Sequence, residues 1–88
     1  MFTWYNIYKL VTKRGVNIML TYVKRIRDLR EDHDKTQQEI ADILGTSQTM
    51  YARYERGANE MPIRHLLVLC KYYGVSADYI LGLKDTLK

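Results

Sequence analysis

The sequence has little of what irregular, crosslinked or membrane-spanning proteins need. One proline and five glycines among 88 residues leave little room for a long structureless loop. The single cysteine, Cys70, excludes an internal disulfide and fits a reducing compartment. No apolar run approaches the ~18 residues of a membrane span, and the first residues lack the basic stretch and apolar core of a signal peptide. We therefore expect one small cytoplasmic domain with no membrane partner.

A strong excess of one charge is also missing from most of the chain. The net charge is +4, but residues 1–18 supply +3 of it, from three basic side chains and no acid. Residues 19–88 carry eleven basic against ten acidic side chains, a net charge of only +1. A duplex-binding surface depends on local positive charge more than on net charge. Composition alone therefore does not indicate a nucleic-acid partner.

Hydrophobic periodicity predicts five helices between about residues 20 and 83. In the first of them, Tyr22, Ile26 and Leu29 recur at i, i+4 and i+7. Thr36 followed by Glu39 matches a capping box, and glycines follow the later helices, as is typical of helix ends. The predicted helices are 20–32, 37–44, 47–56, one that starts at Pro62 and stops before Gly74, and 77–81.

The helix after Pro62 has apolar residues at helical spacing, which predicts that one face packs on the core. We expect Cys70 to be a buried packing thiol and the isolated histidines, His33 and His65, to lie at the surface. The apolar positions of this helix are Ile63, Leu66, Leu67, Cys70 and Tyr73.

The segment 36–57, TQQEIADILGTSQTMYARYERG, is the most informative part of the sequence. It is typical of two short helices joined by a tight turn at Gly45, with Ser47 capping the second helix. Gln48, Thr49 and Arg53 point away from the apolar face of this pair. A helix that packs with one face and presents polar side chains from its N-terminal end suits the major groove of DNA. The apolar face is formed by Ile40, Ala41, Leu44, Tyr51 and Tyr54.

These motifs resemble the Cro/C1-type helix-turn-helix family of phage and bacterial repressors, also called the XRE family. The matching pieces are TQQEIA at 36–41, LGTS at 44–47, YERG at 54–57 and GVSADYILG at 74–82. The resemblance covers about residues 20–83. It implies an all-α, five-helix lambda-repressor-like domain over residues 19–88, preceded by an N-terminal extension over residues 1–18.

The resemblance also implies roles for single residues. Base reading falls to Gln48, Thr49 and Arg53, because an amide pairs with adenine and a guanidinium with guanine. Arg30 and Glu55 match positions of a buried ion pair that fixes the scaffold. Met50 has two interpretations, contact with a thymine methyl group or gap filling. The expected phosphate contacts are Gln37, Ser47, Lys24, Arg25, Arg56 and Asn59, although Lys24, Arg25 and Arg27 are equally well explained as solubilising charges.

Residues 1–18 lie outside the resemblance and have three interpretations. FTWYNIYKLV alternates weakly and forms a β-hairpin with VNIML in the first of them. In the second, Trp4, Ile7, Tyr8 and Val11 make one face of a helix. In the third, translation naturally begins at Met19, because residues 13–16 can be encoded with a ribosome-binding-like AGAGG shortly before that codon.

Two functions follow from these expectations. The first is a sequence-specific transcriptional regulator, a dimeric repressor on a two-fold-related double-stranded DNA operator. The alternative is a protein-interaction module on the same fold, such as an antitoxin-like or anti-repressor protein. The sequence shows no metal-ligand spacing, glycine-rich phosphate loop or nucleophile–base pair, so we expect no enzyme, metal, cofactor or small-molecule ligand. The expected dimer surface is Tyr79, Ile80 and Leu83, because this end of the chain holds more apolar residues than a small core buries.

Overall fold

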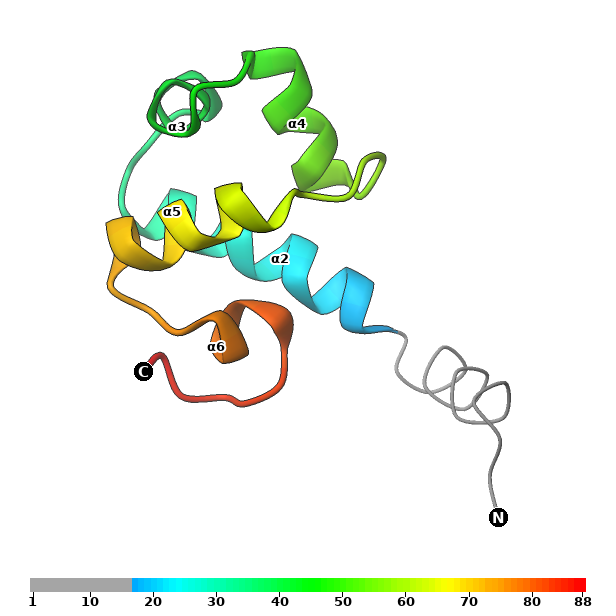
Figure 1. Ribbon diagram of the computed structural model, residues 1–88, viewed down its shortest axis with the longest axis vertical. Coiled ribbons are helices and arrows are strands. Elements are labelled where there is room, and N and C mark those ends of the chain that lie inside the picture. Colours follow the sequence, from blue (N-terminus) through cyan, green and yellow to red (C-terminus); the bar gives the residue numbers. More distant parts are fainter. Residues whose placement is uncertain (1–16) are drawn as a thin grey trace.

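The computed structural model describes residues 17–88, with side chains from residue 21 onward, and this part of the chain contains helices and no strand (Figure 1). The all-α expectation is therefore confirmed. The β-hairpin interpretation is wrong for its second strand, because residues 17–20 are helical; the other interpretations of the extension concern residues outside the described part. The helices are α2 (Asn17–Asp32), α3 (Gln37–Leu44), α4 (Gln48–Arg56), α5 (Ile63–Tyr73) and α6 (Ala77–Leu81).

One hydrophobic core holds these helices together. Tyr22, Ile26 and Leu29 of α2 are buried, so the predicted helical stripe is confirmed. Tyr51 and Tyr54 of α4 are also in this core, and their rings meet edge to face with centroids 6.3 Å apart. Burying one such large side chain stabilises a fold by about 1.5–3 kcal/mol. The largest fully buried side chains are Tyr51, Ile26, Ile40, Leu69 and Ile80.

Local capping sets the start of three helices, as the sequence predicts. The Thr36 hydroxyl accepts from the Glu39 backbone N–H at 3.1 Å, and the Glu39 carboxylate accepts from the Thr36 N–H at 2.9 Å. Ser47 and Ser76 accept from the third N–H of α4 and α6 in the same way. Each cap of this kind contributes about 1 kcal/mol. Because Ser47 lies directly before α4, the cap also determines where that helix begins.

The core face of α5 differs in part from the predicted one: Tyr73 is buried and Leu66 and Cys70 pack against the core as expected, but Ile63 and Leu67 do not. His65, Leu69 and Tyr73, at i, i+4 and i+8, are buried, whereas Ile63 and Leu67 are exposed. The expectation that His65 lies at the surface is therefore wrong: its ring packs 5.9 Å from that of Tyr54. Burial and the nearby Arg64 charge lower the pKa of His65. Helix α5 packs mainly on α3 and α6, and Tyr54 of α4 covers His65, so tertiary contacts place this histidine in the core.

Cys70 packs at the edge of the core and is only partly buried. This partial burial raises the pKa of its thiol, which keeps the sulfur in its neutral form. The expected packing role is therefore confirmed, although the thiol is less enclosed than the sequence suggests.

A buried ion pair joins α2 to α4. Arg30 donates to Glu55 from Nε at 2.7 Å and from Nη2 at 3.0 Å, and its Nη1 donates to the Lys35 carbonyl at 2.9 Å. Only 14% of the Arg30 side chain and 3% of the Glu55 side chain are exposed. Burial raises the pKa of Glu55, but the hydrogen bonds that it accepts from Arg30 and Gln37 outweigh this effect and lower the pKa. The predicted ion pair is present in the structure.

Helix α6 packs closely on α2, and the contact lies at Gly82. This residue ends α6 with φ +84°, and a Cβ built on it would lie 2.7 Å from Cγ2 of Thr21. Arg25 of α2 reinforces the contact, because its Nη1 donates to the Tyr79 and Lys84 carbonyls. A side chain at position 82 would therefore push α6 away from α2.

We expect Glu55→Gln to lower the free energy of unfolding by about 3 kcal/mol, because it leaves the buried Arg30 charge without its partner. The control is Glu31→Gln, since the exposed Glu31 carboxylate lies 4.0 Å from the same guanidinium and should contribute under ~1 kcal/mol. Urea unfolding of both variants measures the difference. Equal destabilisation would contradict a special role for Glu55.

The same pair predicts a pH dependence. Because folding lowers the pKa of Glu55 below its ordinary value of 4.5, its contribution is complete above that pH and is lost as the pH falls below it. Urea midpoints of the wild type should therefore drop more steeply below pH 4.5 than those of Glu55→Gln. Parallel curves would show that Glu55 does not cause the acid dependence.

We expect Gly82→Ala to destabilise the protein more than Gly74→Ala does. Both residues have positive φ, which costs alanine about 1 kcal/mol, but a Cβ at Gly74 meets nothing within 4 Å. The additional clash with Thr21 should add about 1–3 kcal/mol. Thermal melting of the two variants compares them, and equal losses would mean that α6 moves freely away from α2.

Candidate nucleic-acid interface

The helix pair α3–α4 forms the predicted helix-turn-helix arrangement. Gly45 adopts φ +75° between the two helices, and its backbone N–H donates to the end of α3. Thr46 N–H also donates to the Ala41 carbonyl, at 2.9 Å. Ile40, Ala41 and Leu44 of α3 are buried against the core-facing side of α4. The opposite side of α4 is therefore left toward solvent.

That outward side of α4 carries the predicted base-reading residues. Thr49 and Arg53 are exposed, and Gln48 is half-buried at the first position of the helix. Met50 packs against the core instead, which favours the gap-filling interpretation of this residue. The structure thus brings three polar side chains to the outward side of α4, with Gln48 and Thr49 in its first turn and Arg53 in its last.

Hydrogen bonds connect the starts of α3 and α4 to the ion pair beneath them. Gln48 donates from Nε2 to the Gln37 side-chain oxygen at 2.8 Å, and Gln37 donates from Nε2 to Glu55 at 3.1 Å. The Arg30–Glu55–Gln37–Gln48 chain therefore crosses three helices. Sequence reasoning identified all four residues but missed the two bonds made by Gln37. No spacing rule indicates them, because they depend on how α3 and α4 meet.

This series of hydrogen bonds sets the orientation of the Gln48 side chain. One of its two amide N–H groups is used by Gln37, so the other N–H and the side-chain oxygen are left for a ligand. A donor and an acceptor side by side are what the N7 and N6 edge of adenine requires. The bond to Gln37 also limits rotation of the amide, so that the donor and the acceptor keep their order.

Arg53 and Asn59 contact each other at the other end of the surface. Nη1 of Arg53 donates to Oδ1 of Asn59 at 3.2 Å. The backbone N–H groups of Gly57, Ala58 and Asn59 donate to carbonyls at the end of α4. Because these N–H groups already have partners, the side-chain N–H groups of Asn59 are the donors left for a phosphate at that position.

The basic residues of α2 do not all face outward. Lys24 and Arg27 are exposed, although Lys24 forms an ion pair with Asp28. Arg25 lies with its guanidinium 4.2 Å from the Tyr79 ring centre and also contacts Asp85 at 3.1 Å. The phosphate contact expected from Arg25 has less support, because its Nη1 donates to carbonyls of α6 and of the segment after it. Arg56 and Ser47 are exposed, as a phosphate contact requires.

The predicted dimer surface also needs correction. Ile80 is fully buried in the core, and Tyr79 is half-buried beneath Arg25. Of the three residues, Leu83 is the most accessible, with 66% of it exposed. The small domain buries more of this apolar end than expected because α6 packs directly on α2.

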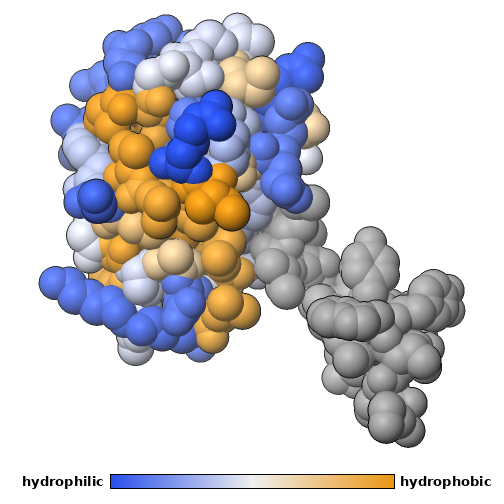
Figure 2. All heavy atoms as spheres, viewed as in Figure 1, coloured by the Kyte–Doolittle hydropathy of each residue, from blue (hydrophilic) through white to orange (hydrophobic). Residues whose placement is uncertain are grey.

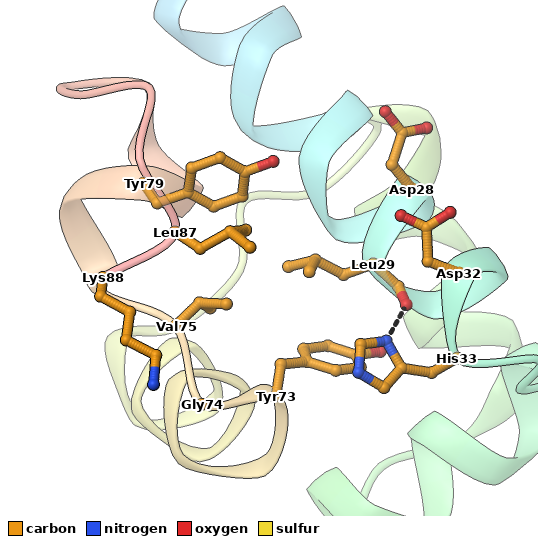
Figure 3. Close-up of a pocket in the computed structure, with 10 residues that line it drawn as sticks. All are labelled: Asp28, Leu29, Asp32, His33, Tyr73, Gly74, Val75, Tyr79, Leu87 and Lys88. Atoms are coloured by element: carbon orange, nitrogen blue, oxygen red, sulfur yellow. Dashed lines mark hydrogen bonds between the residues drawn. The ribbon is translucent and has the colours of Figure 1, made fainter.

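A shallow cavity of about 350 Å³ lies away from α4, between α2, the end of α5 and the last residues of the chain (Figure 3). Asp28 and Asp32 line its α2 side, and Leu29, Val75 and Leu87 extend toward its centre. None of the predicted base-reading residues line it. Within residues 17–88 no cluster of His, Cys, Asp and Glu is suited to a metal ion, and no helix is long and apolar enough to span a membrane.

Comparisons with known proteins agree with this arrangement. A family model described as "Helix-turn-helix" matches residues 26–80. The "Uncharacterized HTH-type transcriptional regulator YobD" of Bacillus subtilis (strain 168) is 39% identical over 64 residues, which cover 73% of this chain and 57% of that protein. The "Cryptic phage CTXphi transcriptional repressor RstR" of Vibrio cholerae is 35% identical over 65 residues, 74% of this chain and 59% of that protein.

A third relative carries a different kind of name. "Antitoxin PezA" of Streptococcus pneumoniae serotype 4 is 37% identical over 59 residues, which cover 67% of this chain and 37% of that protein. The chain spans less than two thirds of each of these three relatives. No solved structure matches it. Since the family model covers more than half of the sequence and includes both helices of the turn motif, the chain belongs to the Cro/C1-type helix-turn-helix family.

Proposed function

We propose that this protein is a sequence-specific transcriptional repressor that binds double-stranded DNA through α4. The main support is the hydrogen bond from Gln48 to Gln37, which holds a base-reading amide at the start of a solvent-facing helix. The names of the relatives agree, since one is a phage repressor and another a transcriptional regulator. Such a protein acts in the compartment that holds the DNA, the cytoplasm of a bacterial or phage-infected cell.

In this proposal, three side chains of α4 read bases in the major groove. Gln48 pairs with adenine through its remaining N–H and its oxygen, and Thr49 contacts a thymine methyl group or a phosphate. Arg53 has five N–H donors and uses one of them for Asn59, so the others are left for guanine O6 and N7. Gln48 and Arg53 lie more than one turn apart on α4, so they reach different base pairs.

Phosphate contacts would position this helix without reading sequence. Gln37 and Ser47 stand directly at the starts of α3 and α4, where backbone N–H groups and helix dipoles favour an anion. Arg56, Lys24 and the Asn59 amide would add contacts at the edges. The weak net charge of residues 19–88 means that each such contact matters for affinity.

We further propose that two copies bind an operator with two-fold-related half-sites. Two recognition helices on one face of B-DNA lie about 34 Å apart, one helical turn. Doubling the contacts compensates for the small number of basic residues on one subunit. The antitoxin reading has less support, because the match to the antitoxin covers only 37% of that protein and includes nothing outside the domain described here.

Selection of duplexes from a random DNA pool at near-physiological salt should enrich a two-fold-symmetric site. Gln48→Ala should then lose about 1–3 kcal/mol of discrimination at one base pair in each half-site. The matched control is Gln38→Ala, because Gln38 is an exposed glutamine of α3 that donates to Asp42. Absence of an enriched site, or equal losses in the two variants, would contradict base reading by α4.

The salt dependence of DNA affinity should distinguish basic residues that contact phosphate from those that hold the fold together. Arg56→Ala should reduce the slope of log affinity against log salt by about 1, because it removes one phosphate contact. Arg25→Ala should leave that slope unchanged and lower the melting temperature instead, because Arg25 binds Tyr79 and Lys84. Titrations of the selected duplex at several salt concentrations measure both slopes. A smaller slope for Arg25→Ala would mean that its guanidinium leaves α6 to bind DNA.

A further inference from the structure

The outward face of α5 combines apolar and basic side chains in a regular pattern. Ile63 is 73% exposed, Leu67 53%, Tyr72 40% and Val68 37%. Single exposed apolar residues are common, but a continuous set on one helix marks an interaction surface. Figure 2, drawn from the same side as Figure 1, shows apolar side chains gathered across the face where α5 lies. We call the set the α5 face: Ile63, Arg64, Leu67, Val68, Lys71 and Tyr72.

These six residues form two parallel rows with a spacing of four residues. One row is Ile63, Leu67 and Lys71, and the other is Arg64, Val68 and Tyr72. Rows of this spacing are the ridges that pack into the grooves of a neighbouring helix. The middle of the α5 face is apolar, since Leu67 and Val68 are both exposed there. A cation lies near each end, because Arg64 is in the first turn of α5 and Lys71 in the last.

The charges of the α5 face are all positive. Helix α5 contains no acidic residue, and its first turn holds Arg64, where the helix dipole disfavours a cation. The helix dipole therefore gives Arg64 no stabilising role at its position. Neither Arg64 nor Lys71 shows an ion pair in the described structure, unlike Lys24, Arg25 and Arg30.

We propose that the α5 face binds an amphipathic helix of another protein, with apolar side chains along its middle and acidic side chains near both ends. Arg64 and Lys71 are seven residues apart, so the partner's acidic residues should be spaced by about two helical turns. The partner's apolar residues would pack on Leu67 and Val68, and its acidic residues would pair with the two cations. This inference does not rest on DNA binding, because it uses no residue of the proposed interface.

The charges argue against a second copy of this protein, or another segment of it, as the partner of the α5 face. In an antiparallel pair of α5 helices Arg64 would meet Lys71 of the second copy, and in a parallel pair each cation would meet itself. Residues 1–18 hold three basic side chains and no acid, so they also lack complementary charge. The exposed acids Glu31 and Asp32 of α2 in a second copy are consecutive residues, so they do not match cations that are seven residues apart on a helix.

Two synthetic helical peptides of about 16 residues test the proposal with the full-length protein. Both carry leucines at i and i+4 spacing; one has glutamates seven residues apart, and the other has lysines at the same positions. Fluorescence anisotropy should show the glutamate peptide binding wild type at least ~10-fold more tightly than the lysine peptide. The double variant Arg64→Glu with Lys71→Glu should reverse this preference, which a nonspecific sticky surface would not do.

The apolar part of the proposal has its own matched pair of variants. Leu67→Asp should weaken binding of the glutamate peptide at least ~10-fold, whereas Leu83→Asp should leave it unchanged, because Leu83 is similarly exposed but lies beyond α6. Circular dichroism confirms that each variant is folded. Three results would overturn the proposal: no binding of the glutamate peptide to wild type, no reversal of preference, or equal losses in the two leucine variants. A wild-type dimer in sedimentation that Leu67→Asp dissociates would overturn it as well, by showing that a second copy is the occupant.

Discussion

The position of α4 depends on the buried pairing of Arg30 with Glu55. A carboxylate that is only 3% exposed cannot remain charged without partners, and here it has one from α2 and another from α3. The two donors approach from different helices, so their geometry constrains how α2, α3 and α4 sit together. Hydrophobic burial supplies most of the stability, but it is not directional. The ion pair is directional, and it therefore determines which side of α4 faces outward.

The backbone supports this arrangement through local devices that act at the helix starts. Thr36 and Ser47 cap α3 and α4, so the first residue of each helix is determined within its own segment. Gln37 and Gln48 then follow their caps directly, which places two glutamines at adjoining helix starts. The hydrogen bond between the two glutamines needs both features. The caps determine where each helix begins, and the ion pair determines how the helices are placed relative to each other.

Much of the fold could be predicted from the sequence because its signals are local. Capping residues, glycine stops and the stripe of Tyr22, Ile26 and Leu29 act over three to seven residues, and each was read correctly. The rest depended on tertiary packing. Nothing near His65 in the sequence shows that Tyr54 covers it, and nothing near Arg25 shows that it binds residues more than 50 positions away. Of the candidate interface, the exposed positions of Thr49 and Arg53 could be predicted, but not the hydrogen bonds of Gln37 and Gln48.

The glutamine pair has a consequence for how such a domain changes over evolution. Because Gln37 holds the amide of Gln48, a substitution at either residue alters the other's surroundings. We therefore expect the two positions to vary together, although they lie eleven residues apart. A substitution at Gln48 alone would leave the side-chain oxygen of Gln37 without its donor. If Gln48 reads a base as proposed, a change of its side chain would therefore also change the hydrogen bonding of Gln37.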